Sequence, residues 1–185
     1  MTDKTVIFTI GHGNRTSNEL IGLLKENHIA CLVDVRTSPY SRFNPQYNKE
    51  TLAFFLKENQ IDYYFKGKQL GGRPADPSCY KSRKIPEQEI DYLHEVDYPE
   101  IMKKDWFLKG VDHLLDLANK QTTAILCSEE DPANCHRHHL ITKFLLENYE
   151  GEVEVFHIRE AGVVFNARQI HKSVTGDKAE QKPLF

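Results

Sequence analysis

Side chains that could perform acid–base, anion-binding or thiol chemistry are concentrated in three short blocks of the sequence. The blocks are Gly11–Asn14, Asp34–Arg36 and Cys127–Arg137, and each begins where an apolar, β-branched run ends. Such runs, separated by segments with helical periodicity, are typical of parallel strands in an α/β domain. Ligands of open parallel sheets bind outside the carboxyl ends of the strands. The sequence therefore predicts one site, at one edge of a sheet, that contains His, Asp, Arg and Cys side chains.

The elements that must position these blocks alternate along the chain. We expect strands at residues 6–10, 31–35, 61–65, 123–127 and 153–158. A capping box at Thr16–Glu19 predicts the start of the first helix, and later helices are expected near residues 49–59, 106–119 and 135–149. The fold class is thus α/β: a three-layer sandwich with a mostly parallel, Rossmann-like sheet of about five strands, helices on both faces and a long insertion near residues 66–100. We expect residues 1–170 to form one domain and residues 171–185 to form a flexible tail.

Composition limits the classes of function. The 185 residues carry a net charge of −3, so strong intrinsic binding to duplex DNA is not expected. No apolar stretch is long enough to span a bilayer, and the polar first residues do not resemble a secretory signal, so we expect a cytoplasmic protein with no membrane association. Four cysteines in a chain of this size indicate free thiols rather than a disulfide framework.

The third block contains the most reactive groups. Cys127 ends a strand, Asp131 has the position of a helix N-cap, and Cys135 opens the following helix, where a thiol pKa is lowered. Cys127 is either a nucleophile or a small hydrophobic residue at the strand end, and Cys135 is either an activated thiolate or a packing residue. Glu129 and its acidic neighbours oppose binding of a phosphate.

Metal binding is a further interpretation of this block, because Cys127, Cys135, His136 and the two histidines after Arg137 are all possible ligands. The block contains neither a Cys-x-x-Cys pair nor a His-x-x-x-His pair. This spacing argues against a structural zinc site, so we expect no metal ligands in this block and no cofactor. A loosely bound catalytic ion that uses His12 or Asp34 is left open.

The first two blocks supply the remaining candidates. His12 is suited to proton transfer near neutral pH, and Asp34 joins His12 and Cys127 as a candidate catalytic residue. Asp34 and Arg36 form either a ligand clamp or a structural ion pair. Guanidinium groups from four loops could together receive a phosphate or carboxylate. The candidate ligand-binding residues are Gly11, Gly13, Asn14, Arg36, Arg42, Arg73, Glu129, Cys135, His136 and Arg137.

Three aromatic residues follow the second block. Tyr40, Phe43 and Tyr47 flank Arg42 and either stack on a base or another flat ligand, or pack onto the domain.

The blocks together resemble a known family. The motifs are Thr9–His12, Leu32–Arg36, Phe43–Pro45, Leu70–Gly72 and Cys127–Arg137, and they look like those of the domain-of-unknown-function family 488 over roughly residues 5–160. This resemblance supports the fold and the position of the site, and implies no particular reaction. The chain is also similar to rhodanese sulfurtransferases in placing a cysteine after a strand. It departs from them because Ser128–Asp131 replaces a loop with glycine and arginine.

The last five residues form a separate motif. Gln181, Leu184 and Phe185 resemble the short peptide with which bacterial repair and replication proteins bind the sliding clamp. They either bind a clamp or fold back on the domain.

Three hypotheses of function follow. The first is a small enzyme that acts on a nucleotide or nucleic-acid base and is brought to DNA by its tail. The second is a noncatalytic module that binds a small anionic or nucleotide-like ligand or a protein partner. The third is a thiol-dependent, sulfurtransferase-like enzyme that uses Cys127.

Overall fold

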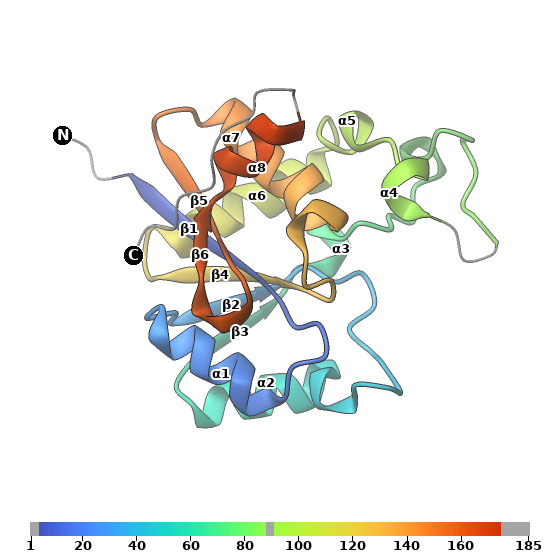
Figure 1. Cartoon of the computed structure of the whole chain (residues 1–185). Helices are drawn as coiled ribbons and strands as arrows, with labels where there is room; N and C mark the ends of the chain where they lie inside the picture. Colours follow the sequence, from blue (N-terminus) through green and yellow to red (C-terminus); the bar gives the residue numbers. More distant parts are fainter. Residues whose placement is uncertain (1–3, 88–90, 175–185) are drawn as a thin grey trace.

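Among residues 4–87 and 91–174, which the computed structural model describes, six strands form one sheet in the order β3-β2-β4-β1-β5-β6 (Figure 1). Neighbouring strands are parallel except for β5 and β6, which are antiparallel. The five expected strands are confirmed. The expectation of about five strands missed β6, because three residues after a 3-10 turn are too short to show a two-residue period. The strands are β1 (Thr5–Gly11), β2 (Cys31–Asp34), β3 (Asp62–Phe65), β4 (Thr123–Cys127), β5 (Val153–Ile158) and β6 (Val164–Asn166).

The helices begin close to the residues that the sequence indicates. At the start of α1, the Thr16 hydroxyl accepts a hydrogen bond from the Glu19 amide, and the Glu19 carboxylate accepts one from the Thr16 amide, which confirms the capping box. The α-helices are α1 (Ser17–Glu26), α2 (Lys49–Glu58), α3 (Gly67–Leu70), α4 (Tyr92–Glu95), α5 (Tyr98–Ile101), α6 (Asp105–Ala118), α7 (Lys143–Asn148) and α8 (Ala167–Val174). A π-helix, Arg137–Thr142, leads directly into α7.

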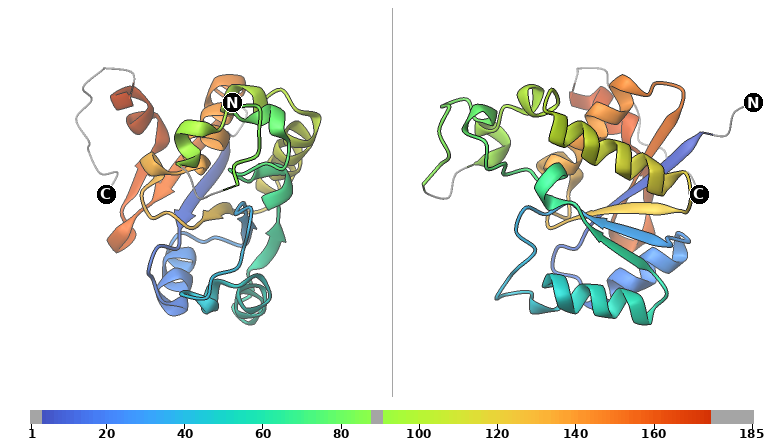
Figure 2. Two further views of the ribbon diagram at one scale, coloured as in Figure 1. Left: turned by 90° about the vertical axis from the view of Figure 1, so that its right-hand side faces the viewer. Right: turned by 180° about the vertical axis from the view of Figure 1, so that it is seen from behind.

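Two apolar clusters fix the helices to the sheet. Leu20, Leu24 and Leu56 of α1 and α2 pack with sheet residues in one cluster, and residues of α6 and α7 pack in the other. The two helix pairs lie on opposite sides of the sheet (Figures 1 and 2). Every residue of β2 and β4 is buried, as expected for central strands covered on both faces.

The expected insertion is present as a chain of short helices between β3 and α6. It extends beyond the carboxyl ends of the central strands (Figure 2). An isolated bridge pairs Tyr80 with Val96 in antiparallel fashion, and the Asp97 amide donates a hydrogen bond to the Cys79 carbonyl. These bonds hold the base of the insertion closed, so that residues near α4 and α5 lie over the same edge of the sheet as the three reactive blocks.

Helix α8 lies at the C-terminal end of the described residues. It begins before residue 170, where the expected domain ends, and runs to Val174. The clamp-binding prediction for Gln181, Leu184 and Phe185 concerns residues outside the described part of the chain. No helix among the described residues is both long enough and apolar enough to cross a membrane.

Candidate functional site

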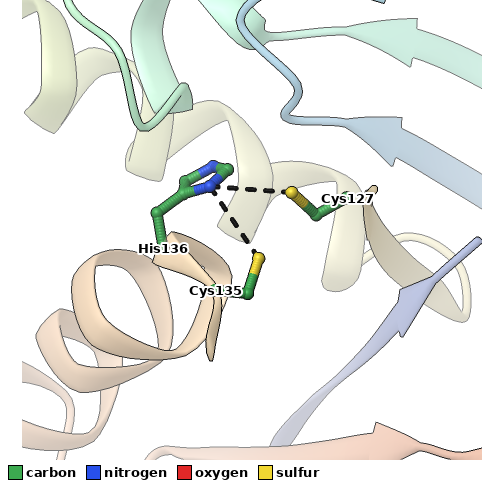
Figure 3. Close-up of side chains that lie close together, drawn as sticks. All are labelled: Cys127, Cys135 and His136. Atoms are coloured by element: carbon green, nitrogen blue, oxygen red, sulfur yellow. Dashed lines mark hydrogen bonds between the residues drawn. The ribbon is translucent and has the colours of Figure 1, made fainter. Parts of the chain in front are cut away.

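The loop after β4 brings two thiols and an imidazole together. The Asp131 carboxylate accepts a hydrogen bond from the Ala133 amide and so caps a 3-10 turn, Pro132–Asn134. In the sequence, Asp131 has the position of a helix N-cap; the residue caps this short turn instead, and the π-helix begins later, at Arg137. As a result, His136 Nδ1 lies 3.6 Å from Cys127 Sγ and 3.9 Å from Cys135 Sγ (Figure 3).

The orientation of the His136 ring is fixed from its other side. His136 Nε2 lies 3.2 Å from the Val35 carbonyl oxygen, and because a carbonyl only accepts, Nε2 carries the hydrogen and donates it. A Cβ atom added at Gly72 would lie 2.6 Å from His136 Cγ, so only glycine leaves room for the ring there. Nδ1 is thereby held facing the two sulfurs.

The two thiols differ in acidity. Burial raises the pKa of Cys135, but hydrogen bonds with Cys127 and His136 and the charges of His136 and Arg137 hold it well below the ordinary thiol value. The hydrogen bond to Cys135, together with burial, raises the pKa of Cys127 well above that value. The arrangement favours a Cys135 thiolate that accepts a hydrogen bond from the Cys127 thiol.

We name these three residues the thiol–imidazole cluster and the hollow beside them the thiol cavity. The cavity has a volume of about 530 Å³, within the range of pockets that hold small molecules. Its walls come from the loops after β2 and β4, from the turn at Gly72 and from the insertion. They comprise Arg36, Thr37, Ser38, Tyr40, Ser41, Gly72, Arg73, Asp91, Tyr92, Leu93, Tyr98, Cys127, Ser128, Glu129, Asn134, Cys135 and His136.

Arg137 shapes the loop that forms one wall of this cavity. Its side chain is fully buried, and its guanidinium donates hydrogen bonds to the carbonyl oxygens of Glu129 (2.5 Å) and Glu130 (2.6 Å). Its Nε donates to the Thr9 hydroxyl at 3.3 Å. A Cβ atom at Gly11 would lie 1.7 Å from the Glu129 carbonyl oxygen, so the loop also depends on a glycine at the end of β1. Gly11, a candidate ligand-binding residue, thus contacts this loop and lines neither the thiol cavity nor the second cavity described below.

A second hollow lies on the other side of the same loop. We name it the histidine cavity; its volume is about 620 Å³. Ser128 and Glu129 line both cavities. The other residues that line the histidine cavity are His12, Gly13, Asn14, Arg15, Glu19, Asn44, Glu130 and Glu160. The sequence predicted one site, and the structure divides its residues between two neighbouring hollows.

His12 is held as a neutral ring. It stacks on Tyr47 with the ring centroids 4.1 Å apart, and its Nδ1 donates a hydrogen bond to the Gly13 carbonyl oxygen at 2.9 Å. Burial lowers the pKa of His12 to about 4, and the positive charge of Arg36 acts in the same direction. At neutral pH, the imidazole is therefore uncharged and can accept a proton only weakly.

This shift predicts a pH dependence of stability. The unfolded chain binds a proton at His12 near pH 6.5 and the folded chain only near pH 4, so the stabilisation is complete above the higher value and falls as the pH falls toward the lower one. Between about pH 7.5 and about pH 5, His12 should account for a loss of about 2 kcal/mol in the free energy of unfolding.

Urea unfolding of the His12→Gln variant at both pH values measures this effect. The variant should lose less stability than the parent on acidification, with the remaining loss partly due to His157, whose pKa is also well below its usual value because it is buried. The His94→Gln variant is the control, since the His94 side chain is 79% exposed. Equal pH dependence in the parent and His12→Gln proteins would contradict the prediction.

Asp34 and Arg36 form a buried, two-point ion pair, as the structural alternative for these residues described. Arg36 Nε and Nη2 donate to the two Asp34 carboxylate oxygens at 2.9 and 2.6 Å. The Tyr63 hydroxyl donates to Asp34 at 2.8 Å, and Arg36 Nη2 also donates to the Tyr47 carbonyl. Asp34 lines neither cavity, whereas Arg36 lines the thiol cavity.

The four candidate arginines do not form one anion site. Arg36 and Arg73 line the thiol cavity, and the Arg73 guanidinium lies over the Tyr92 ring at 4.0 Å. Arg137 is engaged by backbone carbonyls inside the domain. Arg42 lies over the Phe43 ring, 5.0 Å from its centroid, and lines neither cavity.

The three aromatic residues after β2 also lie in different places. Tyr47 packs into the domain beneath His12, and the Phe43 side chain is exposed. Tyr40 is also exposed and lines the thiol cavity, the position in which a flat ligand could stack.

Several lining residues were missed by sequence reasoning. Tyr92 and Tyr98 come from the insertion, which has no hydrophobic period that would indicate their direction. Arg15 lines the histidine cavity and forms an ion pair with Glu130 at 3.3 Å; its position directly before the capping box gave no signal of this contact.

Comparison with known proteins identifies a family and no individual relative. Residues 16–144 match the family described as domain of unknown function DUF488. No curated protein and no solved structure matches the chain.

Proposed function

The chain belongs to the DUF488 family, whose description names no activity, and we propose from its site that it is an enzyme acting on a nucleotide or nucleic-acid base bound in the thiol cavity. The observation that carries this proposal is the position of the thiol–imidazole cluster on the wall of a ligand-sized cavity. Thiol and imidazole groups supply nucleophiles and transfer protons in many enzymes.

Other residues that line the thiol cavity support the choice of substrate class. Tyr40 is 59% exposed and Tyr92 carries the Arg73 guanidinium on its ring, so the cavity offers aromatic faces beside a positive charge. Aromatic and guanidinium faces stack on bases, and a guanidinium also binds phosphate or carboxylate oxygens. Hydroxyl groups at Thr37, Ser38 and Ser41 add hydrogen-bonding groups to the same cavity.

The proposal changes the roles of two candidate catalytic residues. Asp34 accepts hydrogen bonds from Arg36 and Tyr63 and acts as a positioning residue for Arg36. His12 is buried against Tyr47 and faces the histidine cavity. Cys127 keeps its place in the reacting centre, together with Cys135 and His136.

Nucleotide binding is measured by thermal unfolding with a panel of nucleosides and nucleoside monophosphates. A monophosphate at roughly ten times its Kd should raise the Tm by about 3–6 °C. The Arg73→Met variant should bind about 10-fold more weakly, because it loses a charged hydrogen-bond donor. The Arg42→Met variant is the matched control and should bind like the parent, since Arg42 lies outside the cavity.

Two outcomes would contradict this prediction: no nucleotide raises the Tm, or the two arginine variants lose affinity equally. Product formation from the bound nucleotide then separates an enzyme from the noncatalytic alternative. Saturable binding without product would favour a binding module. Loss of turnover in Cys135→Ser with retained binding would support the enzyme.

The layering of the fold and the location of the protein in the cell are also part of the proposal. We propose that the sheet and its helices form a three-layer, Rossmann-like sandwich and that the protein acts in the cytoplasm. Delivery to DNA by a sliding clamp that binds Gln181, Leu184 and Phe185 stays a prediction. Its support is the sequence of the last five residues.

A further inference from the structure

We propose that Cys127, Cys135 and His136 form a binding site for a thiophilic divalent cation of the Zn²⁺ type. The two sulfurs and the imidazole nitrogen all lie within 4.8 Å of one another. In a tetrahedral zinc site with Zn–S near 2.3 Å and Zn–N near 2.0–2.1 Å, a sulfur and a nitrogen ligand are roughly 3.6 Å apart. The observed separations from His136 Nδ1 are 3.6 and 3.9 Å, so the nitrogen–sulfur spacing matches that of a bound zinc ion.

The surroundings prepare these atoms for a metal. Metal-bound histidines usually donate their other ring hydrogen to a carbonyl or carboxylate, and His136 Nε2 does so to the Val35 carbonyl. Gly72 leaves the space that the ring occupies. The Arg137 amide donates to Cys135 Sγ at 3.5 Å, which favours a charged sulfur at this position.

The number of ligands indicates the kind of site. Structural zinc sites use four protein ligands, whereas catalytic sites use three and leave one position for water or substrate. Here, three ligands line the thiol cavity, so the fourth position faces the space in which a substrate would lie. A cation at this position would lower the pKa of a bound water toward neutrality.

This inference departs from the expectation of no metal ligands in the Cys127–Arg137 block, which relied on spacing along the sequence. Cys127 and Cys135 are brought together by the capped 3-10 turn at Pro132–Asn134, and not by a Cys-x-x-Cys loop. Metal binding itself does not depend on the proposed function. A catalytic role for the metal rests on that function, because it requires a substrate in the thiol cavity.

The test is titration of the full-length, metal-free protein with Co²⁺, followed by absorbance. One ion per chain should bind, with a thiolate-to-cobalt charge-transfer band and the visible bands of a tetrahedral ion. Cys127→Ser, Cys135→Ser and His136→Gln should each weaken binding roughly 10-fold or more. Cys79→Ser and His139→Gln are matched controls that should bind like the parent, because Cys79 lies in the insertion and His139 Nε2 donates to the Ala133 carbonyl.

The results separate the two proposals. A charge-transfer band that is lost in Cys135→Ser and kept in Cys79→Ser supports the site, whether or not nucleotides bind. The absence of that band, or its survival in Cys135→Ser, overturns the metal site and leaves the nucleotide measurements unaffected. Circular dichroism checks that each variant is folded, and fast alkylation of Cys127 or Cys135 in the presence of saturating Co²⁺ would also contradict metal ligation.

Discussion

Replacing Arg137 with methionine is expected to lower the free energy of unfolding by about 3–5 kcal/mol. The guanidinium is fully buried and donates to two carbonyl oxygens of the loop between the cavities, and each charged hydrogen bond contributes about 1.5–3 kcal/mol. Methionine fills part of the space and donates nothing, so the Glu129 and Glu130 carbonyls lose their partners. Urea unfolding at neutral pH measures the loss.

Arg159 offers a matched control on the same loop. It forms ion pairs with Glu130 and Asp131, each at 3.2 Å, but its side chain is 28% exposed. Partly exposed ion pairs contribute about 0–1 kcal/mol, so Arg159→Met should cost no more than that. If Arg137→Met and Arg159→Met lose similar free energies of unfolding, the buried Arg137 hydrogen bonds contribute no more than partly exposed ion pairs.

The second large effect is expected for Asp34→Asn, which should cost about 3–5 kcal/mol. The substitution removes the charge that balances Arg36, whose side chain is only 4% exposed, and leaves a buried guanidinium without an anionic partner. Urea unfolding again provides the measurement. The Glu154→Gln variant, which breaks an exposed pair with Lys4, should change stability by less than about 1 kcal/mol.

A double variant tests whether the loss comes from the unpaired charge. Changing Asp34 to Asn and Arg36 to Met together should recover much of the stability lost in Asp34→Asn alone, because no buried charge remains. If the double variant is less stable by the sum of the two single losses, the residues are not energetically coupled and the explanation is wrong.

The strands that carry the site could be predicted because their patterns are local. Apolar, β-branched runs bounded by polar residues indicated β1, β2, β3, β4 and β5, and the Thr16–Glu19 box gave the start of α1. The three residues of β6 are too few for a pattern, and their pairing with β5 depends on a preceding 3-10 turn. The sequence contains no signal for such a nonlocal contact.

The candidate residues lie at the edge of the sheet that the sequence indicated, but their arrangement there was not predicted. Residues after parallel strands share one edge, which placed Arg36 and Cys127 together. The division into two cavities depends on Arg137 holding the Glu129–Glu130 backbone, and a buried arginine cannot be distinguished by sequence from one that binds a ligand. The approach of Cys135 to Cys127 depends similarly on the turn that Asp131 caps.

The π-helix after His136 restricts how the length of this chain can vary. A π-helical turn contains one residue more than the α-helix it interrupts, and one residue corresponds to a rotation of about 100°. The extra residue lets Cys135 and His136 face the cavity while Phe144 and Leu145 of α7 remain buried. A one-residue deletion within Arg137–Thr142 would restore a regular helix. It would also turn either Cys135 and His136 away from the cavity or Phe144 and Leu145 away from the core. In an alignment of family members, a one-residue gap within this segment would therefore indicate a chain that lacks either the thiol–imidazole cluster or the packing of α7.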